Sequence, residues 1–67
     1  MEEARRAIVR KKMAFMHTNI KEHADNEAMV SKMRGLARGY LAAVIEFDII
    51  DDDVARNIFK EEIGEDF

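Results

Sequence analysis

The sequence predicts a small all-α protein. It has no proline and only three glycines in 67 residues, and residues that favour helices are abundant. Apolar residues recur at helical spacing, and 48% of the chain is hydrophobic, which is too much for simple disorder. We therefore expect one helical domain over residues 1–67, with two long antiparallel helices and a short third helix folded against the second.

The first predicted helix covers about residues 2–24. Two glutamates at its start suit the positive end of the helix dipole. One apolar line has the 4-3-4-3 spacing of a helix–helix seam, and a second apolar line lies about 100° away, which indicates two neighbouring helices. The seam consists of Val9, Met13, Met16, Ile20 and His23, and the second line of Ala4, Ile8 and Phe15.

The second predicted helix covers about residues 26–47 and has a broad apolar arc of roughly 180°. Its opposite side carries small residues at i, i+4 spacing: Ser31, Gly35, Gly39 and Ala43. Each glycine in a helix interior costs about 1 kcal/mol relative to alanine. Either another backbone approaches this ridge closely, or the ridge is an exposed surface.

The boundary between the two long helices contains neither glycine nor proline. Asp25 or Asn26 is expected to cap the second helix, with Glu27 in its first turn. The alternative is a single helix over about residues 3–47 in a multichain coiled coil, because one heptad series stays in phase through both segments. The companion series reaches the charged residues Glu27 and Arg34, which favours the antiparallel hairpin.

The third predicted helix covers about residues 52–63. Asp51 or Asp52 is expected to cap it, and Gly64 to end it in the left-handed conformation common at helix ends. Residues 65–67 should form a frayed acidic tail. The connector before this helix should turn two apolar residues inward, Ile49 and Ile50.

Charge divides the chain into a basic and an acidic part. Residues 1–44 hold nine Lys/Arg against five Asp/Glu, a net +4, whereas residues 45–67 hold two against nine, a net −7. This asymmetry indicates a basic arm for an anionic partner, an acidic tail, or two ends that neutralise each other within the fold or across a dimer. The residues predicted to contact an anionic partner are Arg5, Arg6, Arg10, Lys11 and Lys12.

The sequence contains no pattern that predicts catalysis, a cofactor or a metal site. There is no cysteine, and neither Ser31 nor Thr18 belongs to a recognisable nucleophile motif. The aspartates of residues 48–53 lack the spacing of a calcium loop, and helix capping explains them. His17 and His23 are six residues apart and cannot chelate one ion as an i, i+4 pair would. We expect a non-enzymatic function.

The broad apolar faces of both long helices exceed what one short helix covers, so we expect a homodimer and a protein partner. The first hypothesis is a small helical adaptor or regulator, and the alternative is a nucleic-acid-binding dimer that uses the basic first helix. No apolar run of about 18 residues and no signal peptide is evident, so we expect a cytoplasmic protein without membrane contact. The predicted interface residues are Ile8, Val9, Met13, Phe15, Met16, Ile20, Gly35 and Gly39.

Overall fold

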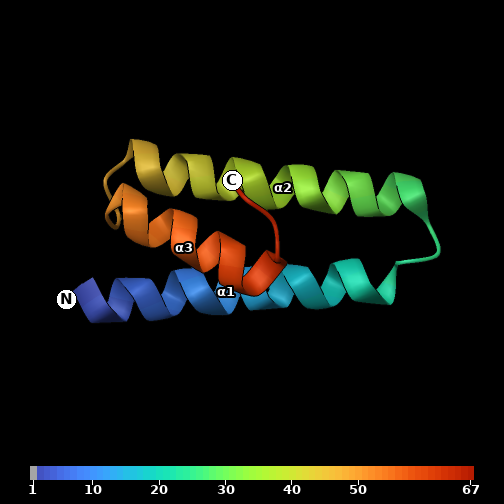
Figure 1. Cartoon of the computed structure of the whole chain (residues 1–67), viewed down its shortest axis with the longest axis horizontal. Coiled ribbons are helices and arrows are strands. Elements are labelled where there is room, and N and C mark those ends of the chain that lie inside the picture. The colour runs from blue at the N-terminus through green and yellow to red at the C-terminus, as the bar shows by residue number, and fades with distance from the viewer. Residues whose placement is uncertain (1) are drawn as a thin grey trace.

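The computed structural model describes residues 2–67, which form three α-helices and no strand: α1 (Glu2–Glu22), α2 (Glu27–Glu46) and α3 (Asp52–Ile63). α1 and α2 lie antiparallel, and α3 returns from the end of α2 and crosses toward α1 on one side of the pair (Figure 1). The all-α class and the antiparallel hairpin are confirmed. The single long helix is wrong, because the chain turns at residues 23–26.

The turn between α1 and α2 ends in a side-chain cap. Asn26 has an extended backbone, with φ −119° and ψ 95°, and its Oδ1 accepts a hydrogen bond of 3.1 Å from the backbone N–H of Met29. This bond satisfies one of the N–H groups that a helix start leaves without a partner. Of the two caps that the sequence offered, Asn26 is therefore the one used.

α2 ends in a Schellman motif that the sequence analysis did not anticipate. The backbone N–H of Ile49 donates to the carbonyl of Val44 at 3.0 Å, and that of Asp48 donates to the carbonyl of Ile45 at 3.1 Å. Asp48 stands at the left-handed position, with φ 53°, where glycine is usual. Aspartate tolerates this conformation better than most residues, so the chain turns sharply here without a glycine.

α3 follows its predicted limits closely. Asp51 is its N-cap residue, although its side chain makes no capping hydrogen bond. Asp52 and Asp53 lie in the first turn, where the helix dipole favours negative charge. Gly64 ends the helix with φ 84°, and its N–H donates to the carbonyl of Lys60 at 2.9 Å, so the predicted left-handed glycine is confirmed.

The core lies between the three helices and receives side chains from each of them. α3 packs against α2, as expected, and contacts α1 more extensively still. The reason is the diagonal path of α3, which runs from the end of α2 toward α1 (Figure 1). Of the two connector isoleucines only Ile50 turns inward, whereas Ile49 is 40% exposed. The buried residues are Val9, Met13, Ile20, Ala37, Leu41, Val44, Ile50, Ala55, Ile58, Phe59 and Ile63.

Candidate functional site

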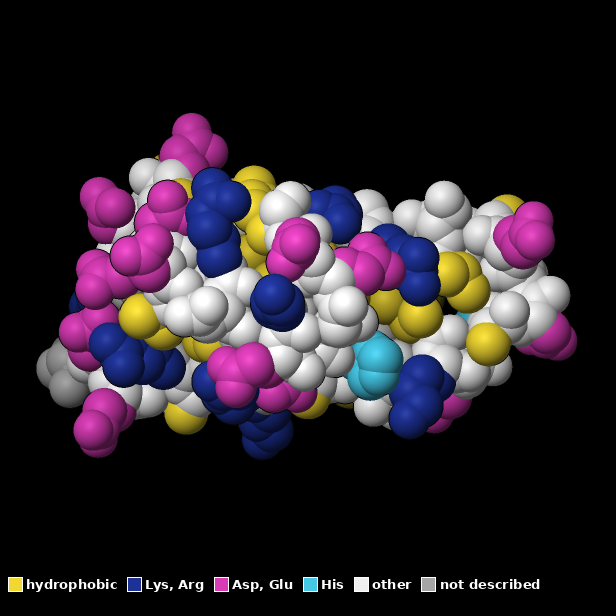
Figure 2. All heavy atoms as spheres, in the orientation of Figure 1, with side chains coloured by type: hydrophobic (Ala, Val, Ile, Leu, Met, Phe, Trp, Pro, Cys, Tyr) yellow, Lys and Arg dark blue, Asp and Glu magenta, His cyan; other side chains and the backbone are white. Residues whose placement is uncertain are grey.

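The α1–α2 pair has two sides, and α3 covers part of one of them (Figure 1). We call the covered side the closed side. Figure 2 shows it from the front, with dark blue basic and magenta acidic side chains interspersed over α3 and its neighbours. Ion pairs join α3 and the residues after it to both long helices. The closed side therefore already has its partner, which is the acidic end of the same chain.

Arg10 of α1 makes the contact between α1 and α3. Its Nη2 lies 3.3 Å from Glu61 Oε1, and its Nη1 lies 3.1 Å from Glu62 Oε2. The hydrogen bond to Glu61, together with that to Glu62, raises the pKa of Arg10 above its usual value. A raised arginine pKa contributes stability that is lost only when the pH rises above that pKa. The Arg10 guanidinium therefore stays charged at every physiological pH.

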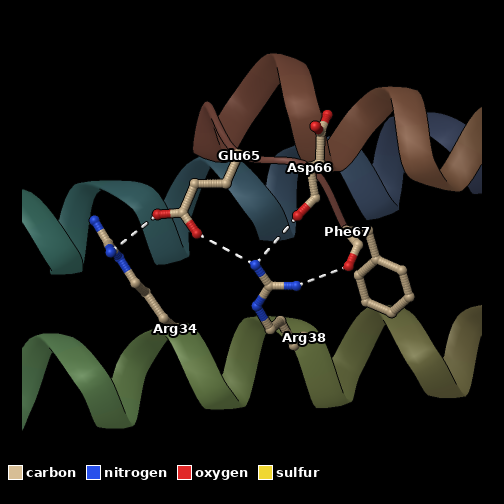
Figure 3. A network of polar contacts seen from close by, with 5 residues as sticks. All are labelled: Arg34, Arg38, Glu65, Asp66 and Phe67. Atoms are coloured by element: carbon tan, nitrogen blue, oxygen red, sulfur yellow. Dashed lines mark hydrogen bonds and ion pairs between the residues drawn. The ribbon is translucent and has the colours of Figure 1, made fainter.

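Arg38 of α2 holds the residues that follow α3 (Figure 3). Its Nη1 donates to the backbone oxygen of Phe67 at 2.9 Å, and its Nη2 donates to the carbonyl of Asp66 at 3.2 Å and to Glu65 Oε1 at 3.3 Å. Arg34, one turn earlier on α2, lies 3.0 Å from the other carboxylate oxygen of Glu65. The frayed tail that the sequence suggested is wrong, because two arginines on one side of α2 bind it.

Aromatic packing completes the closure of this side. The Phe67 ring stands edge-on to the buried Phe59 ring, with centroids 5.5 Å apart and planes at 74°. The Arg38 guanidinium lies 5.1 Å from the Phe59 centroid, and Arg56 lies 5.3 Å from that of Phe67. The basic and acidic parts of the chain thus neutralise each other within the fold, one of the three uses that the charge pattern indicated.

The other side of the α1–α2 pair carries a groove. Lys12 follows Arg10 by two residues, and Tyr40 follows Arg38 by two, so each is rotated about 200° around its helix, away from α3. Both residues line one open groove of about 330 Å³. The groove is lined by Ile8, Lys11, Lys12, Phe15 and Tyr40. It is therefore built by α1 and α2 alone.

Large apolar side chains surround this groove and remain exposed to solvent. Ile8 is 63% exposed and Phe15 60%, although both lie on the groove. On α2, Leu36 precedes Tyr40 by one turn and is 54% exposed. Phe47, the residue that caps the end of α2, follows Tyr40 by about two turns and is 71% exposed. We call this surface the open face. It consists of Ile8, Lys11, Lys12, Phe15, Leu36, Tyr40 and Phe47.

The two lysines of the open face are not neutralised by the chain. Within residues 2–67 neither Lys11 nor Lys12 forms an ion pair, and no carboxylate lines the groove. The ammonium group of Lys12 lies 5.8 Å from the centroid of the Phe15 ring. The open face therefore combines exposed apolar surface with unpaired positive charge.

The remaining residues of the predicted basic set point elsewhere. Arg6 pairs with Glu2 at 3.1 Å, and Arg10 pairs with α3. Arg5 lines a separate hollow beside the acidic connector, together with Asp48 and Asp51. Only two of the five predicted anion contacts thus belong to the open face.

The structure divides the predicted interface residues into two groups. Val9, Met13 and Ile20 are buried in the core of their own chain, and Met16 packs against that core. Val9, Met13 and Ile20 are therefore not accessible to a second chain, whereas Met16 keeps part of its surface exposed. Ile8 and Phe15, from the second apolar line of α1, remain exposed beside the groove.

The glycine ridge of α2 is exposed. A Cβ atom added at Gly35 or Gly39 would meet nothing within 4 Å, and Ser31 and Ala43 are exposed as well. No other backbone of this chain approaches the ridge, so within the chain the exposed interpretation holds.

Three residues of the open face were not proposed as interface residues from the sequence: Leu36, Tyr40 and Phe47. Their spacing of about one and two turns places them on one edge of the broad apolar arc, about 80° to 120° from its buried centre between Ala37 and Leu41. That offset is the signal from which they could have been found.

The histidines do not form a metal site. His23 Nδ1 lies 2.9 Å from the carbonyl of Asn19, and His17 is half-buried, its Nδ1 without a hydrogen-bond partner. Among residues 2–67 no group of three or more His, Asp or Glu side chains could hold a metal ion. In the same part of the chain, no helix has both the length and the apolar character needed to cross a bilayer.

The fold and the open face define a small three-helix protein with an uncovered apolar groove between its two long helices. Comparisons with protein-family models, with curated proteins and with solved structures find no match to the chain. Its function must therefore be inferred from its own residues.

Proposed function

We propose that this protein is a non-enzymatic binding module, an adaptor or regulator, that holds a protein partner on its open face. The observation that carries the proposal is that Ile8 and Phe15, which line the groove, are more than half exposed, although the chain has a closed core elsewhere. Leu36, one turn before Tyr40 on α2, is more than half exposed as well. Contiguous exposed apolar surface on a small domain marks an interaction site. The core residues do not need these side chains in order to pack.

Nucleic-acid binding has less support than protein binding. Affinity for nucleic acid grows with the number of phosphates that free Lys and Arg side chains neutralise. Arg6 and Arg10 are paired with glutamates, and the groove that Lys11 and Lys12 line is largely apolar. A nucleic-acid-binding dimer nevertheless stays the alternative, and the cytoplasmic location stays a prediction from the composition.

Site-specific photocrosslinking in the cells that make the protein tests the proposal. A photoreactive phenylalanine analogue replaces Phe15 in one variant and Asn57 in a control, because Asn57 is exposed on the outer side of α3. We expect protease-sensitive adducts from position 15 and none from position 57. No adduct at position 15, equal adducts at both positions, or adducts that nuclease removes would each contradict the proposal.

A further inference from the structure

We infer that the partner presents an acidic amphipathic α-helix to the open face. This inference rests on the proposed function and specifies the chemistry of the partner. It draws on three features of the molecule: the spacing of the apolar residues that line the groove, the charge of the groove, and the absence of a matching surface on a second copy of the chain.

The spacing of the apolar residues that line the groove suits a bound helix. It runs between two antiparallel helices, with Ile8 and Phe15 on one wall and Tyr40 on the other. Ile8 and Phe15 are seven residues apart, so they stand about 10 Å apart along α1. A bound helix repeats its apolar side chains at i, i+3/i+4 and i+7 over the same distance. Such a helix, laid along α1, places one anchor beside each of these residues.

The charge of the groove selects an acidic helix. Lys11 and Lys12 lie between Ile8 and Phe15 in the sequence and therefore along the same two turns of α1. Neither has a carboxylate partner within residues 2–67. Asp or Glu side chains that flank the apolar anchors of a partner helix would pair with them. A basic helix would be repelled at the same place, which gives the groove its specificity.

A second copy of the chain offers no matching surface. In a two-fold dimer the same patch meets itself, so Lys11 and Lys12 of both copies would enter one interface to which neither groove brings a carboxylate. The acidic α3 side of another copy has the opposite charge, but its large apolar residues Ile58, Phe59 and Ile63 are buried in their own core. The two-fold dimer therefore lacks the negative charge that Lys11 and Lys12 require, and the acidic α3 side lacks exposed apolar side chains.

Selection from a displayed library of helical peptides tests the inference on the full chain. Peptides are selected on the wild-type protein and counter-selected on Phe15→Glu, with Asn57→Glu as a matched exposed control. We expect enriched peptides that are amphipathic and net acidic. The best of them should bind Phe15→Glu and the double variant Lys11→Glu, Lys12→Glu at least tenfold more weakly, and Asn57→Glu equally well.

A charge-swapped peptide tests whether Lys11 and Lys12 select an acidic partner helix. When Lys replaces the acidic residues of the selected peptide, binding to wild-type protein should be lost and binding to Lys11→Glu, Lys12→Glu should be restored. Circular dichroism verifies that each variant stays helical, which is expected because all the substituted side chains are exposed.

Five outcomes would overturn the inference. They are no enriched peptide, enriched peptides that are neutral or basic, absence of the charge-swap rescue, dimerisation that Phe15→Glu abolishes, and Phe15-dependent binding to phosphatidylglycerol/phosphatidylcholine vesicles. Neutral or basic peptides that still depend on Phe15 would leave the proposed function intact. If no peptide depends on Phe15 for binding and no photo-adduct forms at position 15, both the inference and the proposed function are wrong.

Discussion

The two sides of the α1–α2 pair are built from the same helices, but one is paired with the acidic end of the chain and the other is exposed to solvent. On the closed side, Arg10 and Arg38 bind glutamates from the acidic end of the chain, and Phe67 packs against Phe59. On the open face, Lys12 has no carboxylate partner within residues 2–67, and the neighbouring apolar residues face solvent. A shift of two residues along α1 separates an arginine that pairs with α3 from a lysine that has no carboxylate partner within residues 2–67.

The largest expected difference between the two sides is that between two phenylalanines. Phe59 is 1% exposed, so Phe59→Ala should lose about 3 to 5 kcal/mol of unfolding free energy, most or all of what a domain of this size has. Phe15 is 60% exposed, so Phe15→Ala should change it by less than about 0.5 kcal/mol. Urea unfolding followed by circular dichroism measures both. Equal losses would show that something also covers Phe15.

Removing Arg38 tests how much this residue contributes to stability and to the order of residues 65–67. Arg38→Ala deletes the bonds to Glu65 and to the backbone oxygens of Asp66 and Phe67, and should lower stability by about 1 kcal/mol because the guanidinium is partly exposed. Backbone NMR relaxation should show residues 65–67 becoming mobile. Lys32→Ala, on an exposed residue of the same helix, should do neither. A tail that stays ordered in Arg38→Ala would show that the Arg34–Glu65 ion pair and the packing of Phe67 hold it without Arg38.

The glycine ridge allows a smaller test, on a third surface of α2. Because no atom lies near an added Cβ, Gly35→Ala and Gly39→Ala should each raise the unfolding free energy by about 0.5 to 1 kcal/mol. The reverse change at an exposed position of the same helix, Ala42→Gly, should lower it by a similar amount. If either glycine substitution destabilises the protein, a second chain covers the ridge in solution.

The smallest effect is expected at the turn that sends α3 to one side. Asp48 has φ 53°, so Asp48→Gly should raise the unfolding free energy by about 0.5 kcal/mol, whereas Asp48→Val should lower it. Thermal unfolding of the two variants gives the sign. Destabilisation by glycine would mean that the aspartate side chain makes a favourable interaction at this turn that outweighs its strain.

Features that depend on local chemistry were predictable from the sequence. The cap at Asn26 follows from a side-chain oxygen three residues before an unpaired N–H, and the end at Gly64 from the residue best suited to positive φ. The turn at Asp48 was missed, because a left-handed aspartate has no distinct sequence signal. The docked tail was missed for another reason: it depends on Arg34 and Arg38, roughly thirty residues away, which no local pattern links to it.

The candidate site was only partly predictable, because periodicity identifies a helical face without identifying the neighbour that covers it. Both apolar lines of α1 were found, but the regular seam through Val9 and Met13 was assigned to a partner and proved to be the core. The line through Ile8 and Phe15 remained open instead. The choice between them is made by the path of α3, which is a property of the whole chain.

Thiol labelling of single-cysteine variants tests most directly whether one side is closed by the chain and the other is open. The sequence has no cysteine, so each variant carries one probe. Leu36 is 54% exposed and its neighbour Ala37 is fully buried. Under native conditions Leu36→Cys should react with a thiol reagent nearly as fast as in urea, and Ala37→Cys should be protected by orders of magnitude. Protection at both positions would contradict an open face, and rapid reaction at both would contradict the core.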